Sequence, residues 1–237
     1  YLKPKADGQL CLDSLASLID ETVLLVSVML VNNETGVVQP IAKIAKMAHD
    51  IGALMHSDLA QSVGKLDWTV DSLGIDLGSL SAHKTHGPKG IGALYVRRGS
   101  CRVAEQQHGG QHERGMRSGT LPTHQIVGMG EAYRIAQTES AAEIDHLNRL
   151  RDRIESAIDE LGGIRCNGAR GVPHILNITV DGVDAERLMA AMPTIAVSTG
   201  SACNSATIEP SYVLQAMGLT RKQGLSSLRI SLGRMTT

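Results

Sequence analysis

Aromatic residues are scarce in this sequence of 237 residues: phenylalanine is absent, and Phe, Trp and Tyr together account for 2% of the chain. A hydrophobic core must therefore be built from Leu, Ile, Val, Met and Ala. Hydrophobic residues still make up 42% of the chain and charged residues 20%, which is ordinary for a globular protein. The length allows one large domain or two smaller ones.

An excess of positive charge is also lacking, because 23 basic residues face 24 acidic ones and the net charge is −1. This balance predicts no direct contact with nucleic acid. No apolar run approaches the ~18 residues of a membrane span, and no signal-peptide pattern is visible, so no membrane partner is expected. The four cysteines form no C-x-x-C pair, which argues against a zinc site or a disulfide framework and favours a reducing, cytoplasmic location.

Apolar runs alternate with helical patterns in the first half of the chain. Thr22 to Val31 is a continuous apolar run typical of a strand covered on both faces, and Pro40 opens a helical pattern that ends at Gly52. Further apolar runs precede Asp58 and Ser81, and Ile91 to Val96 is expected to be a strand running away from them. This alternation predicts an α/β domain with a mostly parallel sheet.

The second half begins with a helical pattern from Pro122 to Leu161, which Gly162 and Gly163 end. Strands are then expected at 175–180, 195–198 and 228–232, with a helix at 184–192. We therefore predict a large domain over residues 1–135, followed by a linking helix and a smaller α+β domain over residues 136–237. Because the chain begins at Tyr1 and stops at Thr237 without a closing signal, both ends are expected to be cuts through a longer protein.

Asp58 and Lys84 each follow one of the predicted strands, and the carboxyl ends of parallel strands converge at one sheet edge where ligands bind. Lys84 lies beside His83 and just before the turn at Gly87 and Pro88, which suits a Schiff-base lysine in a cramped pocket. A carboxylate paired with such a lysine can hold the ring nitrogen of pyridoxal phosphate protonated. A surface lysine and a helix-capping aspartate would explain the same two residues equally well.

The segment from Arg97 to Thr120 is rich in Gly and polar residues and is too long for an ordinary connection. The glycines between His108 and His112 break the helical spacing that a metal-binding histidine pair would need, so we expect no intrinsic metal site. Four other side chains of the segment are suited to binding a phosphate, namely those of Arg114, Arg117, Ser118 and Thr120.

A run of small residues from Thr199 to Thr207 surrounds Cys203. Such residues pack poorly as a core, so the thiol of Cys203 is expected to lie on an exposed and flexible loop.

Six motifs occur in one order along the chain: NNETG, SDLAQSVGK, SAHKTHGPKGIGALYVRRG, HERGMRSGTLP, STGSACNSA followed by EPSYVL, and SSLRISLGR. Together they resemble the group I cysteine desulfurases, the IscS- and NifS-like members of the class V, fold-type I pyridoxal phosphate enzymes. The resemblance covers essentially all 237 residues.

The resemblance implies a role for each of several residues. Lys84 would form the Schiff base with pyridoxal 5'-phosphate and Asp58 would bind the ring nitrogen, with Gln61 on the ring hydroxyl and Asn33 nearby. Ser81 and His83 would hold the phosphate, and Thr120 would reach the phosphate of the neighbouring subunit in a homodimer. Arg229 and Asn33 would bind the substrate, L-cysteine, with Arg229 on its carboxylate.

The implied reaction converts L-cysteine to L-alanine and leaves the sulfur on Cys203 as a persulfide. The sulfur would then pass to an iron-sulfur scaffold or to a relay protein for thiolation, and Cys203 would share a cluster with the scaffold only transiently. The resemblance also implies further N-terminal and C-terminal parts that this sequence lacks. Two other functions share parts of the pattern: selenocysteine lyase or another class V aminotransferase, and a truncated, non-catalytic fragment that binds a partner.

The sequence departs from the usual family pattern at four positions, which we interpret as subgroup variation because Lys84, Asp58 and Cys203 are present. These positions are Ala82, His86, Asn204 and Leu225.

Overall fold

The computed structural model describes residues 1–199 and 209–237, and the chain divides into two compact units. Residues 19–30 and 40–139 form what we call the parallel-sheet unit, and residues 1–18, 31–39 and 140–237 form the antiparallel-sheet unit. The domain boundary at residues 135 and 136 stays a prediction.

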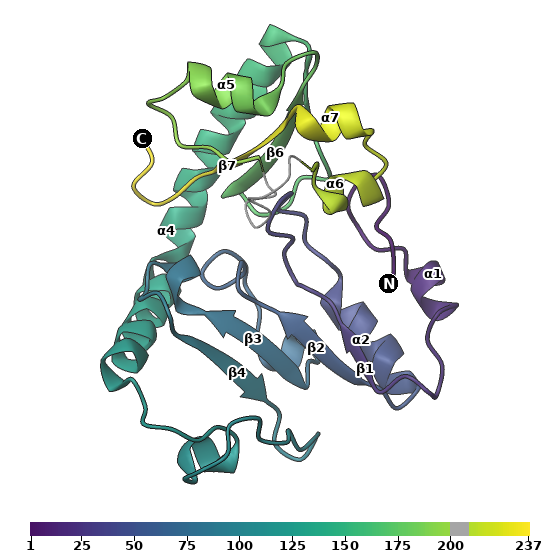
Figure 1. Cartoon of the computed structure of the whole chain (residues 1–237), viewed down its shortest axis with the longest axis vertical. Helices are drawn as coiled ribbons and strands as arrows, with labels where there is room; N and C mark the ends of the chain where they lie inside the picture. The colour runs from purple at the N-terminus through teal and green to yellow at the C-terminus, as the bar shows by residue number, and fades with distance from the viewer. Residues whose placement is uncertain (200–208) are drawn as a thin grey trace. The chain divides into compact units, whose positions relative to one another are not determined.

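The parallel-sheet unit is built on four strands in the order β1-β2-β3-β4 (Figure 1). The strands are β1 (Leu25–Ser27), β2 (Leu54–Asp58), β3 (Leu77–Ser81) and β4 (Gly92–Val96). β1, β2 and β3 are parallel, whereas β4 is antiparallel to β3. The predicted α/β class with a mostly parallel sheet is therefore confirmed.

The first strand is shorter and more exposed than the sequence predicted. β1 spans three residues instead of ten, and of these only Val26 is buried, while Leu25 is 43% exposed. The backbone N–H groups of Val28 and Leu30 still donate to the carbonyls of His56 and Asp58. Backbone pairing with β2 thus continues beyond the end of β1. The prediction that the side chains of this run are covered on both faces is wrong.

Helix α2 (Ile41–Asp50) supplies an apolar face to this unit, and its residues Ile41, Ile44, Ala45 and Ala48 are buried. It begins directly after Pro40, as expected from the fixed backbone angle of proline. The short helix α3 (Val70–Leu73) begins at a capping box made by Thr69 and Ser72.

Asp76 links three parts of the parallel-sheet unit through one buried carboxylate. It accepts hydrogen bonds from the backbone N–H of Met55 and from Nε2 of His49, both at 2.8 Å, and from the Ser100 hydroxyl. Burial alone would raise the pKa of Asp76, but these hydrogen bonds outweigh burial and lower it. The network joins β2, the end of α2 and the turn after β4.

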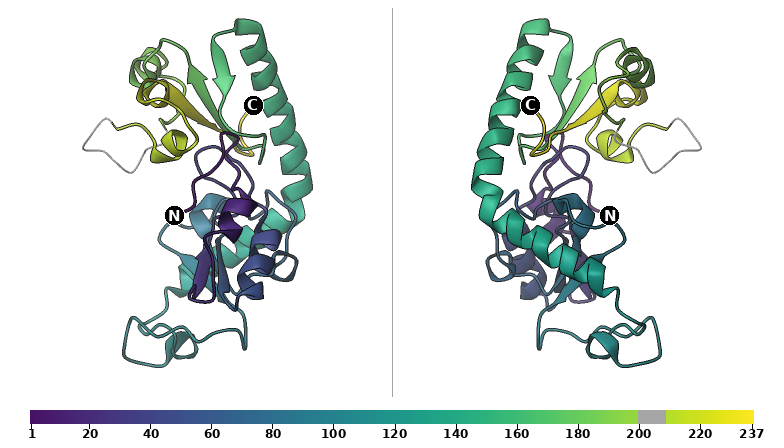
Figure 2. Two further views of the ribbon diagram at one scale, coloured as in Figure 1. Left: turned by 90° about the vertical axis from the view of Figure 1, so that its right-hand side faces the viewer. Right: turned by 90° about the vertical axis from the view of Figure 1, so that its left-hand side faces the viewer.

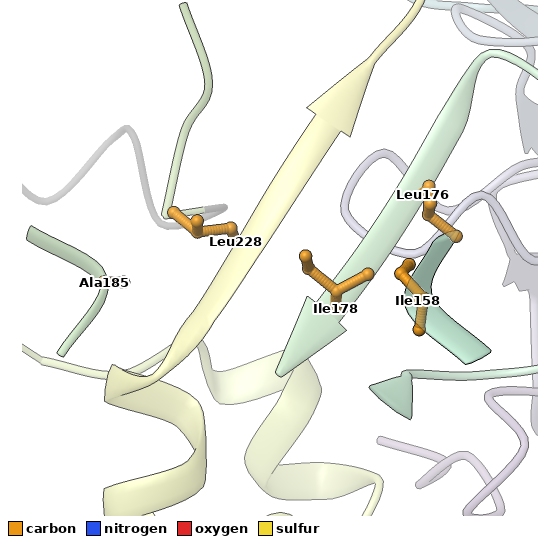
Figure 3. Close-up of a cluster of buried hydrophobic side chains, with 5 residues drawn as sticks. All are labelled: Ile158, Leu176, Ile178, Ala185 and Leu228. Carbon is orange, nitrogen blue, oxygen red and sulfur yellow. The ribbon is translucent and has the colours of Figure 1, made fainter. Parts of the chain in front are cut away.

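The antiparallel-sheet unit has a second sheet in the order β5-β6-β7, all antiparallel. Its elements are α1 (Leu12–Ala16), β5 (Ile164–Cys166), β6 (Ile175–Val180), α5 (Ala185–Ala191), α6 (Tyr212–Ala216), α7 (Arg221–Leu225) and β7 (Ser227–Ser231). Figure 3 shows the buried cluster of this unit, in which side chains of β6 and β7 lie with those of α4 and α5. The cluster consists of Ile158, Leu176, Ile178, Ala185 and Leu228.

Helix α4 (Thr123–Leu161) has 39 residues and contributes to both units. Within the antiparallel-sheet unit, the second half of α4 runs along the sheet in both views of Figure 2. Gly162 and Gly163 follow it with φ angles of 68° each, which confirms the predicted end. Within the antiparallel-sheet unit, the buried Arg151 of α4 donates to the carbonyls of Val172 and Ile175.

Two local predictions in the second half had different outcomes. The helix at 184–192 is confirmed by α5, whose capping residue Asp184 accepts from the N–H groups of Glu186 and Arg187. The strand at 195–198 is wrong, because only Ser198 makes a bridge, to Arg229. Within the described ranges, no helix has both the length and the apolar character needed to cross a bilayer.

Candidate active site

Asp58 and Lys84 lie at the same edge of the parallel-sheet unit. Asp58 is the last residue of β2 and is in register with Ser79 of the neighbouring parallel strand β3. Lys84 lies three residues beyond the end of β3, in a 3₁₀ turn over Ala82–Thr85. The predicted placement of the two residues at one carboxyl edge is therefore confirmed, whereas their chemical roles stay predictions.

The half-buried Asp58 is fixed by its backbone and by one carboxylate oxygen. Its carbonyl accepts from the Leu30 N–H, and its Oδ1 accepts from the Ala60 N–H at 2.9 Å. This bond closes a turn and does not cap a helix, so the capping explanation for Asp58 is wrong. Gln61 follows within the same turn region.

The turned segment after Asp58 also holds the only tryptophan of the chain. Its indole Nε1–H donates to the carbonyl of Ser62 at 3.4 Å. Ser62 itself is buried and donates to the carbonyl of Leu59. Trp68 therefore packs onto the segment that carries Asp58 and Gln61.

The turn that carries Lys84 is closed at both ends by backbone hydrogen bonds. The N–H of Ala82 donates to Ile91, and the N–H of Gly87 donates to Ala82 at 2.9 Å. Gly87 is required there because a Cβ would lie 2.9 Å from the Ala82 carbonyl oxygen. Lys84 itself is exposed, so the cramped pocket predicted around it is not formed by the described residues. Two other residues of the turn, Ala82 and Thr85, are buried.

Ser81 and His83 form a polar pair beside Lys84. Ser81 Oγ and His83 Nδ1 are 2.9 Å apart, and the Tyr133 hydroxyl donates to the Ser81 carbonyl at 3.4 Å. Burial raises the pKa of Tyr133 to about 12, so its phenol stays protonated as a donor at neutral pH. The hydroxyl and the imidazole next to the amine form a donor set that suits an anion.

Thr120 is not brought to that pair by any hydrogen bond in the described part of the chain. Its side chain is exposed, while the neighbouring Ser118 is buried and donates to the Gly110 carbonyl. Arg117 Nη1 donates to the carbonyl of Gly119, two residues further along the chain, at 3.5 Å. Among residues 1–199 and 209–237, no three His, Cys, Asp or Glu side chains gather as a metal site would require.

Asn33 and Arg229 lie together in the antiparallel-sheet unit. Arg229 of β7 donates from Nη1 to the Asn33 carbonyl at 3.2 Å, which places the predicted substrate-binding arginine beside the NNETG turn. Neighbouring Glu34 is 5% exposed, and burial raises its pKa despite a hydrogen bond from Ser211 and the charge of Arg229. Sequence analysis did not select Glu34, although its place in the motif next to Asn33 was a usable signal.

Cys203 lies outside the described residues. His56 was also missed by the sequence analysis, although its position two residues before Asp58 puts both side chains on the same face of β2. Within the parallel-sheet unit, Lys84, Asp58, Ser81 and His83 provide an amine, a carboxylate and two anion donors. A ligand with a carbonyl, a basic ring nitrogen and a phosphate therefore fits this set.

Comparisons with known proteins cover the whole chain. The family described as aminotransferase class-V matches residues 1–237. The cysteine desulfurase IscS of Pectobacterium atrosepticum is 53% identical over 240 aligned residues, which cover 100% of this chain and 59% of that protein. The cysteine desulfurase IscS of Methylococcus capsulatus is 52% identical and is covered to 60%. The chain thus spans about three fifths of the length of these relatives.

Solved structures agree with these relatives. A NifS-like protein superimposes with a TM-score of 0.90 at 33% identity, covering 100% of this chain and 63% of that one. SspA in complex with cysteine gives a TM-score of 0.84 at 35% identity, with 100% and 67% covered. DndA from Streptomyces lividans gives 0.82 at 34% identity, with 98% and 67% covered.

Proposed function

Because the chain belongs to the aminotransferase class-V family and has its fold-type I architecture, we propose that it acts as a pyridoxal phosphate-dependent cysteine desulfurase. The observation that carries the proposal is the placement of Asp58 and Lys84 at the same edge of neighbouring parallel strands. The identity of 53% to a cysteine desulfurase supports the choice of reaction within the family.

The described residues suit each part of pyridoxal 5'-phosphate. Lys84 provides the amine for its aldehyde, Asp58 the carboxylate for its ring nitrogen, and Ser81 with His83 the donors for its phosphate. Gln61 is proposed to bind the ring hydroxyl, and Asn33 is kept as a further cofactor-binding residue. When bound, the cofactor withdraws electrons from the carbon atoms of the amino acid attached to it, which weakens the bonds that have to break.

Substrate binding and sulfur removal are assigned to three residues of the chain. Arg229 binds the carboxylate of L-cysteine, and Asn33 lies beside it. The thiolate of Cys203 attacks the substrate sulfur, so that a sulfur–sulfur bond forms while the carbon–sulfur bond breaks. The electron pair of the broken bond and a proton stay with the carbon skeleton, which leaves as alanine.

The persulfide on Cys203 then passes its sulfur to an acceptor protein. We propose that the acceptor is an iron-sulfur scaffold or a relay protein for thiolation, and that Thr120 acts across the interface of a homodimer. The cytoplasmic location stays a prediction.

Substitution of Lys84 tests the cofactor assignment. We expect Lys84→Ala to lose the visible absorption band of bound pyridoxal phosphate and alanine formation from cysteine, because no other amine replaces it. Lys89→Ala is the matched control, since Lys89 is an exposed lysine of the same segment whose backbone carbonyl alone accepts a hydrogen bond, from Gln125. Normal turnover by Lys84→Ala would reject the proposal.

Substitution of Cys203 separates sulfur transfer from the related reactions. Cys203→Ala should keep the cofactor band and lose alanine formation from cysteine, whereas Cys166→Ala, at an exposed cysteine of β5, should keep both. Unchanged alanine formation in Cys203→Ala would favour a selenocysteine lyase or another aminotransferase. A wild-type chain that takes up no cofactor would favour a non-catalytic, partner-binding fragment.

A further inference from the structure

The imidazole of His56 connects three strands of the parallel-sheet unit. His56 Nδ1 lies 2.8 Å from the Ser27 hydroxyl of β1, and Nε2 lies 2.9 Å from the Ser79 hydroxyl of β3. Ser27 is the register partner of His56, whereas Ser79 is the register partner of Asp58. Both ring nitrogens are thus engaged, and the ring cannot rotate without breaking a hydrogen bond. We call Ser27, His56 and Ser79 the serine–histidine bridge.

The bridge lies on the sheet face that carries Asp58. Side chains alternate along β2, so that Met55 and Ser57 are buried on one face while the half-buried His56 and Asp58 share the other. Ser79 is the register partner of Asp58 in the parallel neighbour β3, so the two side chains lie on the same face of the sheet. One end of the bridge therefore adjoins the carboxylate that we assign to the ring nitrogen.

The imidazole of the bridge is uncharged at neutral pH. Burial lowers the pKa of His56, and the charge of Asp58, the charged group that acts on it, offsets this only in part. A neutral ring has one donor and one acceptor nitrogen, so one serine donates to it and the other accepts from it. The bridge thus orders the surroundings of Asp58 without supplying a cation that would compete for its carboxylate.

We propose that His56 is a positioning residue for Asp58, and that the serine–histidine bridge fixes the Asp58 carboxylate for the ring nitrogen of the cofactor. This inference rests on the proposed function, because it assumes that Asp58 binds that nitrogen. A histidine that only stabilised the sheet would leave the protonation of a bound ring unchanged. The bridge, in contrast, should strengthen the hold of Asp58 on the ring proton.

The coupling between His56 and Asp58 is tested first without cofactor. We would follow the His56 ring by nuclear magnetic resonance over a pH titration in wild type, Asp58→Asn and Ser57→Ala. Asp58→Asn should lower the titration midpoint of His56, because it removes the negative charge that favours the imidazolium. Ser57→Ala removes a buried hydroxyl from the opposite face of the same strand and should not move it. Equal midpoints in wild type and Asp58→Asn would overturn the inference.

The effect on the cofactor is tested next with protein loaded with pyridoxal 5'-phosphate. His56→Gln keeps a polar group that can reach Ser79 and loses the bond to Ser27. In this variant the midpoint of the pH titration of the visible band should move to lower pH, to about threefold higher proton concentration. The dissociation constant of the cofactor should rise about tenfold. Ser57→Ala should match wild type in both measurements.

The two failures are distinguishable. An unchanged band titration in His56→Gln, with a normal band in wild type, would overturn the inference and leave the proposed function intact. Absence of the band in wild type would overturn the proposed function, and the role of His56 with it. Loss of the band in Ser57→Ala as well as in His56→Gln would mean that any change in β2 disturbs the site, which also contradicts a specific bridge.

Discussion

Arg229, which the sequence predicted as a site residue, and Glu34, which it did not, lie together at the NNETG turn. Arg229 has a buried Nε, and Glu34 a buried Oε2, that find no hydrogen-bond partner among the described residues. Buried polar atoms are normally paired, so unpaired ones near a site favour a ligand or water at that place. A substrate carboxylate on Arg229 would satisfy its free nitrogen.

Replacement of this arginine by lysine tests its geometry rather than its charge. We expect Arg229→Lys to raise the KM for cysteine by about tenfold or more, because an ammonium group cannot form the paired hydrogen bonds that a guanidinium forms with a carboxylate. The measurement is steady-state alanine formation, with Arg149→Lys on an exposed part of α4 as control. An unchanged KM would remove Arg229 from the substrate site.

Single residues that carry unusual chemistry could be predicted from the sequence, but their supporting residues could not. Lys84 and Asp58 follow recognisable strands and so could be placed at one edge. His56 and Glu34 became visible only through their partners: Ser27 lies 29 positions from His56, and Ser211 follows Glu34 by an even longer separation. Such pairings depend on strand register, which local patterns do not specify.

At the scale of elements, the NNETG turn depends on one glycine. Gly36 has a φ of +76°, and a Cβ at this position would lie 2.7 Å from the Ile175 carbonyl oxygen. The Gly36 carbonyl also accepts from the N–H of Val172. The turn that bears Asn33 and Glu34 is therefore packed directly on the backbone at the start of β6.

We expect Gly36→Ala to lower the free energy of unfolding by about 3 kcal/mol or more, because it adds a backbone clash to the cost of a left-handed conformation. Gly182→Ala is the matched control: its φ is +78°, but nothing lies within 4 Å of the added Cβ. It should cost only about 1–2 kcal/mol. Urea denaturation of both variants measures the difference, and equal losses would contradict the close packing at Gly36.

The Asp76 network predicts a stability difference that depends on pH. Asp76→Asn should lower the free energy of unfolding at pH 7 by about 2 kcal/mol, because the charged acceptor of three hydrogen bonds is lost. Since the pKa of Asp76 lies below its ordinary value of 3.8 in the folded protein, its contribution is complete above that value and is lost as the pH falls through the folded pKa.

Urea denaturation at pH 7 and at pH values below 4 checks this dependence. The gap between wild type and Asp76→Asn should narrow at the acidic end. Asp67→Asn, at an exposed aspartate, serves as control and should show no gap at either pH. A gap of constant size would mean that the carboxylate charge contributes little.

Element boundaries were predictable where a capping residue or a glycine marks them. Asp184 before α5 and the glycines after α4 are examples. The apolar runs at 22–31 and 195–198 were overestimated as strands, because apolar character does not tell how many backbone groups find a ladder partner. Only three residues of the first run form a strand, although Val28 and Leu30 also donate to the backbone of β2, and the second run has a single bridge.

For the whole molecule, the two units interleave along the chain in a way that composition does not reveal. Residues 31–39 belong to the antiparallel-sheet unit, although they are flanked on both sides by residues of the parallel-sheet unit. The short segment carries Asn33 and Glu34, whose partners come from the distant residues Arg229 and Ser211. Sequence patterns could assign the fold class, but not this exchange of segments.

The proposed dimer can be tested with heterodimers made from two different inactive variants. If Thr120 serves the neighbouring subunit, a mixture of Lys84→Ala and Thr120→Val protomers contains heterodimers with one fully intact site. Random exchange should then restore about a quarter of the wild-type sites, although each variant alone is inactive. Alanine formation after mixing and subunit exchange measures this recovery. No recovery would place Thr120 in its own subunit's site or outside any site.

The position of Trp68 gives this protein a built-in optical reporter. As the only indole in the chain, and hydrogen-bonded to Ser62 just beyond Gln61, it emits from the segment that carries Asp58 and Gln61. Excitation energy passed from this indole to a nearby absorbing ligand would dim its emission. Loading and loss of the cofactor should thus be readable from intrinsic fluorescence, without a label.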